Sequence, residues 1–146
     1  NNSSLVARPL GRFRWVTCGS PDYLREYGVP PSPEALSQHR AVHYFSGQAR
    51  RADEFRFLRH GETFSVPVSG TAAVNETGLY IKMCLAGFGL AQLAENIVAD
   101  HLREGRLVEV LADWQPPPVP VTLLYPHQRF LSPAVRAFAE WMSEVV

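Results

Sequence analysis

The stretch from 78 to 114 constrains this chain most, because it orders a helix, a glycine break, a short strand, a second helix and a final strand. The first helix carries a single charge, Lys82, so we expect it to be buried on most of its faces. Gly87 and Gly89 are expected to end this helix and to turn the backbone into a strand at 90–93. This order of elements predicts an α/β unit.

The second helix of this stretch is amphipathic. Its pattern predicts an apolar face turned inward and a charged face turned outward. Gly105 supplies the left-handed residue that closes the helix before a strand at 107–111. The inward residues are Ile97, Val98 and Leu102, and the outward residues are Asp100, Arg103 and Glu104.

Short β-rich runs alternate with capped helices along the rest of the chain. Helices are expected after Ser20, Ser32 and Ser132, each of which is followed by a proline suited to the first helical position. The alternation predicts a mixed, mostly parallel sheet with helices on both faces. The predicted strands are 13–18 and 107–111, both expected among the central ones, then 41–45, 68–74, 90–93 and 121–125, with a hairpin formed by 55–58 and 62–68 and a proline-rich linker at 115–120.

Composition indicates one compact domain without an electrostatic footprint. The chain has 146 residues, 46% of them hydrophobic, which is enough for one sizeable core. Fourteen basic residues balance fourteen acidic ones, so we expect no binding to nucleic acid or to an anionic membrane. No apolar run could span a bilayer and the N-terminus does not resemble a signal peptide, so a cytoplasmic location is expected. Cys18 and Cys84 lie in apolar runs that favour buried thiols over a disulfide.

Small polar residues follow the ends of three predicted strands. They are Gly19 with Ser20, Ser46 with Gly47, and Asn75 with Glu76 and Thr77. Ligands of parallel sheets bind at the carboxyl ends of the strands, and the N–H groups of helix N-termini suit a carboxylate or a similar anion. The same residue types are equally typical of caps and turns that bind nothing.

Catalytic and metal-binding patterns are not persuasive. Ser20 lies in CGSPD rather than in a G-x-S-x-G turn, and no nucleophile, base and acid stand together. His39 and His43 are four residues apart, but the run at 41–45 reads as a strand that directs them apart, and no third ligand is indicated nearby. We therefore expect no enzymatic activity, no metal and no cofactor.

The run AGFGLAQL at 86–93, followed by a helix and then EGRLVEVLADW at 104–114, resembles the effector-binding domain of LysR-type transcriptional regulators. The segment at 5–36 is similar to the place where these regulators cross from their first effector subdomain to their second. RAVHYFSG, VSGTAAVNE and LLYPHQRFLSPAVRAFAEWM then follow in the family's order. The resemblance covers essentially the whole chain. It implies a Rossmann-like subdomain of the type II periplasmic-binding-protein architecture.

The resemblance also implies a division of the chain. Residues 1–12 would be the crossover from the first subdomain, 13–126 the second subdomain, and 127–146 the return crossover with a C-terminal helix that packs on the first subdomain. Family members begin with a winged helix-turn-helix, a linker helix and the first subdomain, so the chain is expected to be a fragment. The positions that would line the effector cleft are Tyr44, Ser46, Gly47, Asn75, Glu76, Thr77, Tyr125 and His127.

The function expected from the resemblance is ligand sensing in a bacterial transcription regulator. A small-molecule effector would bind between two subdomains and control DNA binding, with DNA contacted only by a helix-turn-helix elsewhere in the full protein. The C-terminal helix carries an apolar stripe that we expect to promote a homo-oligomer. The stripe consists of Val135, Phe138, Met142 and Val145.

Two other functions are open. A fragment of a periplasmic-type solute-binding receptor is the alternative, and a small enzyme is a third class.

Overall fold

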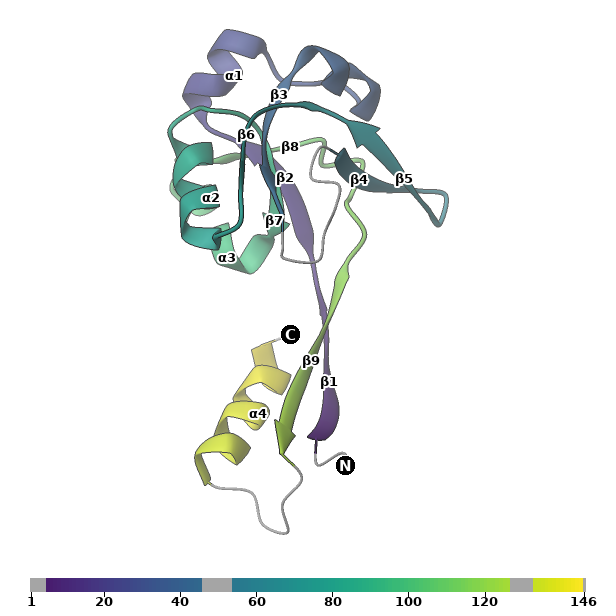
Figure 1. The fold of residues 1–146 in the computed structure, drawn as a ribbon, viewed down its shortest axis with the longest axis vertical. Helices are drawn as coiled ribbons and strands as arrows, with labels where there is room; N and C mark the ends of the chain where they lie inside the picture. Colours follow the sequence, from purple (N-terminus) through teal and green to yellow (C-terminus); the bar gives the residue numbers. More distant parts are fainter. Residues whose placement is uncertain (1–4, 46–53, 127–132, 146) are drawn as a thin grey trace. The chain divides into compact units, whose positions relative to one another are not determined.

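A computed structural model describes residues 5–45, 54–126 and 133–145 of the chain (Figure 1). The chain divides into two compact units, one made of residues 14–117 and the other of residues 1–13 with 118–146. The larger unit contains β2 (Trp15–Gly19), α1 (Pro21–Tyr27), a 3-10 helix η1 (Pro33–Gln38), β3 (Arg40–Tyr44), β4 (Glu54–Arg59), β5 (Glu62–Pro67), β6 (Ser69–Val74), α2 (Thr77–Leu85), β7 (Ala91–Ala94), α3 (Glu95–Arg103) and β8 (Val108–Val110). The smaller unit contains β1 (Leu5–Phe13), β9 (Val119–Pro126) and α4 (Pro133–Val145).

Strand β2 lies between β7 and β8 and runs antiparallel to both. A parallel bridge joins Ala41 to Leu90 and thereby links β7 to β3, which pairs in parallel with β6. Strands β8, β7, β3 and β6 therefore run in one direction and β2 in the other, so the predicted mixed, mostly parallel sheet is confirmed. The expectation that both 13–18 and 107–111 are central was wrong for the second, because the only described ladder of β8 is with β2. The predicted hairpin is confirmed as β4 and β5.

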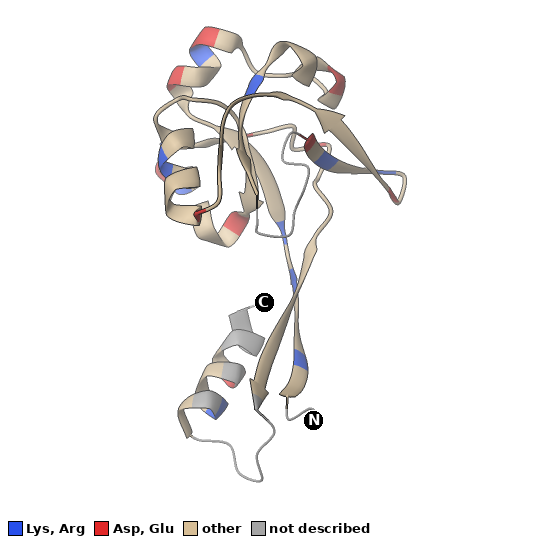
Figure 2. Cartoon of the chain, viewed as in Figure 1, with Lys and Arg blue, Asp and Glu red and all other residues tan. Residues whose placement is uncertain are grey.

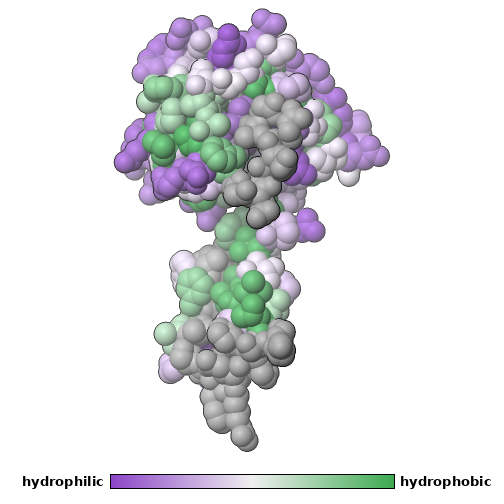
Figure 3. Space-filling view, viewed as in Figure 1, coloured by the Kyte–Doolittle hydropathy of each residue, from purple (hydrophilic) through white to green (hydrophobic). Residues whose placement is uncertain are grey.

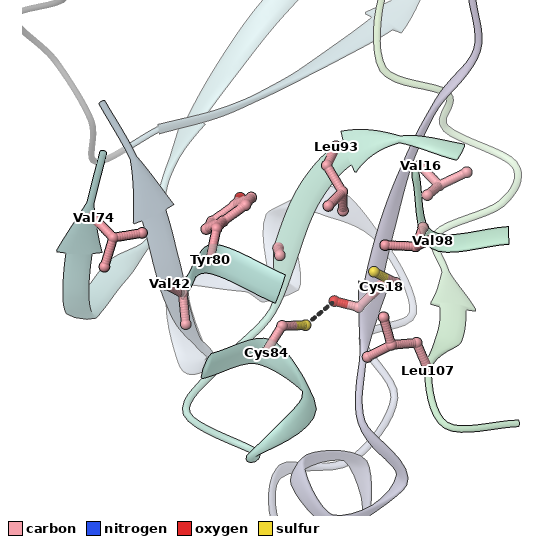
Figure 4. Close-up of a cluster of buried hydrophobic side chains, with 10 residues drawn as sticks. Val16, Cys18, Val42, Val74, Tyr80, Cys84, Leu93, Val98 and Leu107 are labelled. Carbon is pink, nitrogen blue, oxygen red and sulfur yellow. Dashed lines mark hydrogen bonds between the residues drawn. The ribbon is translucent and has the colours of Figure 1, made fainter. Parts of the chain in front are cut away.

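Alternate residues of the strands direct their side chains to two buried clusters. One cluster joins the sheet to α2 and α3, and its members come from elements far apart in the sequence (Figure 4). The other joins the sheet to α1, η1 and the β4–β5 hairpin. Helices therefore cover both faces, as predicted. The first cluster includes Val16, Cys18, Val42, Tyr80, Cys84 and Val98, and the second includes Tyr23, Leu36, Ala41, Phe55, Phe57 and Val110.

Helix α2 buries only one of its sides, which corrects the expectation that most of its faces are covered. Tyr80 and Cys84 are buried, whereas Leu79 is 47% exposed, because the helix lies on a single face of the sheet. It contributes to the apolar part of the surface of this unit (Figure 3). In α3 the inward position of Ile97 was also wrong, since this side chain is 47% exposed. Val98 is buried and Leu102 packs against the core, as predicted.

Caps and close approaches determine where the helices begin and end. The Ser20 hydroxyl accepts a hydrogen bond from Tyr23 N at 3.1 Å, so the predicted N-cap is confirmed. The Ser32 side chain makes no such bond, and the helix that follows it is a 3-10 helix. A Cβ atom at Gly89 would lie 2.7 Å from Ala41 Cα, so only glycine permits the approach of the backbone that forms the Ala41 to Leu90 bridge.

The smaller unit corrects the predicted linker at 115–120. Strand β9 begins at Val119 and pairs antiparallel with β1, with Pro120 opposite Arg12. Among the described strands β9 pairs on one side only, so no second ladder requires an N–H donor at this position. A proline, which has no N–H, is therefore tolerated there. Helix α4 contacts β1. Phe138 is 49% exposed, while the side chains of Val135, Met142 and Val145, and Ser132 as a whole, lie outside the described part of the chain.

Cys18 and Cys84 are free thiols buried in the same cluster, as expected (Figure 4). The Cys84 thiol donates to the Cys18 carbonyl oxygen, with 3.7 Å between the sulfur and the oxygen. The neighbouring Cys84 side chain and burial both raise the pKa of Cys18, so its thiol stays protonated. Among the described residues, no helix has the length and apolar content that a membrane span requires.

Burial lowers the pKa of His39 below its ordinary value of 6.5. The imidazole is enclosed with Tyr23, whose hydroxyl accepts from Arg40 N and bonds to His39 Nδ1, each at 2.8 Å. Because the unfolded chain binds the His39 proton at a higher pH than the folded chain, the free energy of unfolding should fall as pH drops below about 6.5 and not above it. Urea titrations from about pH 7.5 to about pH 5 would measure this slope.

The His39→Asn variant should have a shallower pH dependence, because its amide oxygen can replace Nδ1 as the acceptor without titrating. His60→Asn is the matched control, since His60 lies at the exposed turn of the hairpin with a φ of 53°, which asparagine tolerates. An unchanged slope in His39→Asn would contradict the assignment.

Candidate functional site

A pocket of about 420 Å³ lies in the larger unit, at the edge of the sheet where β3 and β7 end. Tyr44 is the last residue of β3, Ala94 is the last of β7, and Thr77 is the first of α2. Trp15 reaches the same edge because β2 runs in the opposite direction and pairs Trp15 with Ala94. The pocket is therefore at the carboxyl ends of the parallel strands, as sheets of this kind predict. Its other lining residues are His43, Glu54, Phe55, Arg56, Tyr80, Gln92, Leu93 and Ile97.

The deep part of the pocket is mainly apolar and aromatic. Aromatic rings meet edge to face there, His43 with Phe55 at 5.6 Å and Tyr44 with Tyr80 at 5.5 Å between ring centroids. Glu54 and Arg56 are exposed and lie one strand repeat apart on β4. A ligand would therefore bury an apolar portion among the rings. The lining residues that are at most 4% exposed are His43, Phe55, Tyr80, Leu93 and Ala94.

The hydroxyl of Tyr80 and the side chain of Gln92 are both occupied by hydrogen bonds within the protein. Tyr80 Oη accepts from Gln92 N at 2.9 Å and donates to Gln92 O at 3.2 Å, and burial raises the pKa of Tyr80, so the phenol is neutral. Gln92 Oε1 accepts from Arg56 N, and its Nε2 donates to Arg56 O and to Thr17 Oγ1, all at 3.0 Å. The Gln92 amide therefore substitutes for a backbone partner and attaches the hairpin to the sheet.

The structure separates the residues that the sequence grouped at one site. Tyr44 and Thr77 line the pocket. Gly19 and Ser20 do not, because β2 is antiparallel and its carboxyl end lies beside the start of β7, where Cys18 pairs with Ala91. The space there is filled, since a Cβ atom at Gly19 would lie 2.7 Å from Leu90 Cδ2, and the Ser20 hydroxyl is buried in its cap.

Asn75 and Glu76 are exposed beside the pocket but do not line it. The Glu76 carboxylate caps α2 by accepting from Leu79 N at 2.7 Å and Gly78 N at 3.0 Å, and these bonds lower the pKa of Glu76. These are the N–H groups that an anionic effector was expected to find free. Tyr125 belongs to β9 in the smaller unit, while Ser46, Gly47 and His127 lie outside the described residues. The role of all these positions in effector binding stays a prediction.

Sequence reasoning missed most of the pocket, including Trp15, His43, Phe55, Tyr80 and Gln92. A polar residue inside a short buried strand was the available signal, as in AVHY and AQLA. Such a residue must find a hydrogen-bond partner or face a cavity, and His43 had been weighed only as a metal ligand. The aromatic residues carried no signal, because core and pocket aromatics look alike in a sequence.

His39 and His43 are held by separate partners. His39 Nδ1 bonds to the Tyr23 hydroxyl, and His43 Nε2 donates to the Val68 carbonyl oxygen, each at 2.8 Å. No group of three or more histidine, cysteine or acidic residues in the described part of the chain is arranged to hold a metal ion.

Replacing Gln92 with alanine should detach the hairpin from β7. Three hydrogen bonds would be lost, two of them to backbone groups of Arg56, and we expect the free energy of unfolding to fall by about 1–3 kcal/mol. Hydrogen exchange at the Arg56 amide should accelerate. Gln38→Ala, at an exposed position of η1, is the matched control and should change neither quantity. Wild-type exchange at Arg56 in the Gln92→Ala variant would contradict the attachment.

Comparison with known proteins shows that residues 1–146 match the family model of the LysR substrate binding domain. The chain is 34% identical over 142 residues to the uncharacterized HTH-type transcriptional regulator YhjC of Escherichia coli (strain K12), covering 97% of this chain and 48% of that protein. It is 35% identical over 144 residues to an HTH-type transcriptional repressor of Pseudomonas aeruginosa (strain UCBPP-PA14), covering 99% and 45%. The chain thus spans less than half the length of these relatives.

Solved structures agree on the fold. The regulatory domain of CrgA, a LysR-type transcriptional regulator from Neisseria meningitidis, superposes with a TM-score of 0.80. The match covers 99% of this chain and 71% of that chain, at 24% sequence identity. Since the family model accounts for every residue from 1 to 146, the chain belongs to the LysR substrate binding domain family.

Proposed function

We propose that this chain senses a small-molecule effector on behalf of a bacterial LysR-type transcription regulator. The observation that carries the proposal is the pocket of about 420 Å³ at the ends of β3 and β7, in a chain of the LysR substrate binding domain family. Pockets of this size and apolar character are typical of sites for small organic molecules. The effector contacts Tyr44 and Thr77 from the sheet edge and α2, and Phe55 and Arg56 from the hairpin.

Sensing follows from where the pocket walls come from. Helix α2 and the β4–β5 hairpin are separate elements, and both contribute lining residues. A ligand that touches both binds most tightly when they hold one arrangement, so its binding favours that arrangement over others. If DNA affinity depends on the same arrangement, it is coupled to effector binding. The effector then changes the affinity for DNA by the same factor by which DNA changes the affinity for the effector.

DNA binding is assigned to a different part of the regulator. The chain has a formal net charge of zero, and its basic and acidic residues are interspersed on the larger unit (Figure 2). Nucleic-acid surfaces need a concentration of positive charge. Both curated relatives are described as HTH-type regulators and extend well beyond the matched region. The regulator works as a homo-oligomer in the cytoplasm, where its DNA lies.

The alternatives have weaker support. A solute-binding receptor would share the architecture, but the relatives are described as transcriptional regulators. An enzyme would need a catalytic constellation, and Tyr80 and Gln92 at the pocket floor are engaged in structural hydrogen bonds. The regulatory family is the simpler account.

Filling the pocket should abolish ligand binding. Thr77→Trp places an indole at an exposed position that lines the pocket, so small molecules that raise the melting temperature of the wild-type chain should not stabilise this variant. Asn75→Trp is the matched control, because Asn75 is also exposed, two residues away, and does not line the pocket. A thermal-shift screen of a metabolite library measures both. A ligand that stabilises Thr77→Trp as much as wild type would remove the pocket from the proposal.

Mobility-shift assays separate the DNA-binding function. The chain of residues 1–146 should leave specific promoter DNA unshifted even at low salt, where electrostatic binding is strongest. The full-length regulator should shift the same DNA, and its shift should respond to the stabilising ligand. Sequence-specific retardation by residues 1–146 alone would show that DNA contacts lie in this chain after all.

A further inference from the structure

One imidazole nitrogen in the pocket has no hydrogen-bond partner among the described residues. His43 is 4% exposed and lines the pocket, and its Nε2 lies 2.8 Å from the Val68 carbonyl oxygen. A carbonyl can only accept, so Nε2 carries the hydrogen and donates it. In a neutral imidazole the other nitrogen, Nδ1, then has no hydrogen and is an acceptor.

The surroundings of His43 indicate where Nδ1 is accessible. Among the described residues Nδ1 has no hydrogen-bond partner, yet none of their buried side-chain nitrogen or oxygen atoms lacks one. This pattern agrees with an Nδ1 that is reachable from outside the core. The other edge of the ring is enclosed, because Nε2 contacts Val68 and a Cβ atom at Gly70 would lie 2.8 Å from Cδ2. The accessible edge of the ring therefore faces away from β6. The pocket that His43 lines is the space this edge can reach.

The neighbouring polar groups of the floor offer a ligand much less. The Tyr80 hydroxyl already donates its hydrogen bond to Gln92 O, and the Gln92 side-chain amide is hydrogen-bonded to Arg56 and Thr17. The aromatic rings of Trp15, Phe55 and Tyr80 line the pocket beside His43. Flat apolar walls around one unsatisfied acceptor favour a ring that carries a hydrogen-bond donor.

We propose that the pocket takes a small aromatic ring bearing a hydroxyl or N–H group, which donates its hydrogen to His43 Nδ1. The inference rests on the proposed function in that this ring belongs to the effector. His43 is then a specificity-determining residue: it selects for the donor, while the rings select for the planar apolar body. A site built around an unpaired acceptor discriminates against analogues that lack the donor, because they leave the acceptor desolvated and unpaired.

Phenol and toluene test this, because they have nearly the same shape and differ in one donor group. Titration of the full chain, followed by NMR signals of Leu93, Ala94 and Ile97, should give an affinity for phenol about tenfold higher than for toluene. In a pocket without an acceptor, the more apolar toluene would bind more tightly than phenol. His43→Phe should reverse the order, because the ring keeps an apolar planar shape and has no hydrogen-bond acceptor.

A measurement on the wild-type chain alone does not depend on the folding of that variant. The ¹⁵N resonance of His43 Nδ1 should move toward the position of a hydrogen-bonded nitrogen when phenol is added, and should not do so with toluene. Equal or weaker binding of phenol in the wild-type chain, no binding of either probe, or a phenol preference that survives in His43→Phe would overturn the inference. The proposed function fails separately. It would fail if Thr77→Trp left effector binding intact while the wild-type chain still bound phenol more tightly than toluene.

Discussion

The pocket depends on the direction of one strand. Strand β2 enters between β7 and β8 and runs against both, so its first residue, Trp15, meets the last residue of β7, Ala94. A parallel β2 would place the buried cap of Ser20 at this edge instead of an indole ring. The antiparallel strand therefore gives the site its aromatic wall and sends the first helix of the unit, α1, to the opposite edge of the sheet.

Close backbone approach keeps the two halves of the sheet together. Gly89 has no side chain, which lets Leu90 bridge to Ala41 and joins β7 to β3. These two strands deliver Ala94 and Tyr44 to the pocket. On the hairpin side the connection is made by a side chain, because the Gln92 amide replaces the backbone partner that Arg56 would have in a continuous sheet. The hairpin is also held by the Leu58 N–H, which donates to the Gln115 carbonyl oxygen at 2.8 Å, and by the buried rings of Phe55 and Phe57.

The helix end nearest the pocket shows how a local cap restricts ligand chemistry. Glu76 supplies its own carboxylate to the N–H groups of Gly78 and Leu79 and thereby neutralises the partial positive charge of α2. An external anion would have to displace it. His43 is the contrary case in our proposal, a buried group with one nitrogen bonded to the Val68 carbonyl oxygen and the other proposed to accept from the ligand. On this proposal the site favours a ligand that donates a hydrogen bond over one that accepts it.

The elements of this protein could largely be predicted from the sequence, because caps, glycine breaks and apolar periodicity act over a few residues. The cap at Ser20, the hairpin around Gly61 and the strand that leads to Tyr44 all follow from such local rules. The direction of β2, the edge position of β8 and the exposure of Ile97 do not, because they depend on contacts between residues that are distant in sequence. The same limit applies to the site. Thr77 was predicted because it follows a strand end and Tyr44 was predicted from the family resemblance, whereas Trp15, His43 and Gln92 reach the pocket only through tertiary pairing, which local patterns do not encode.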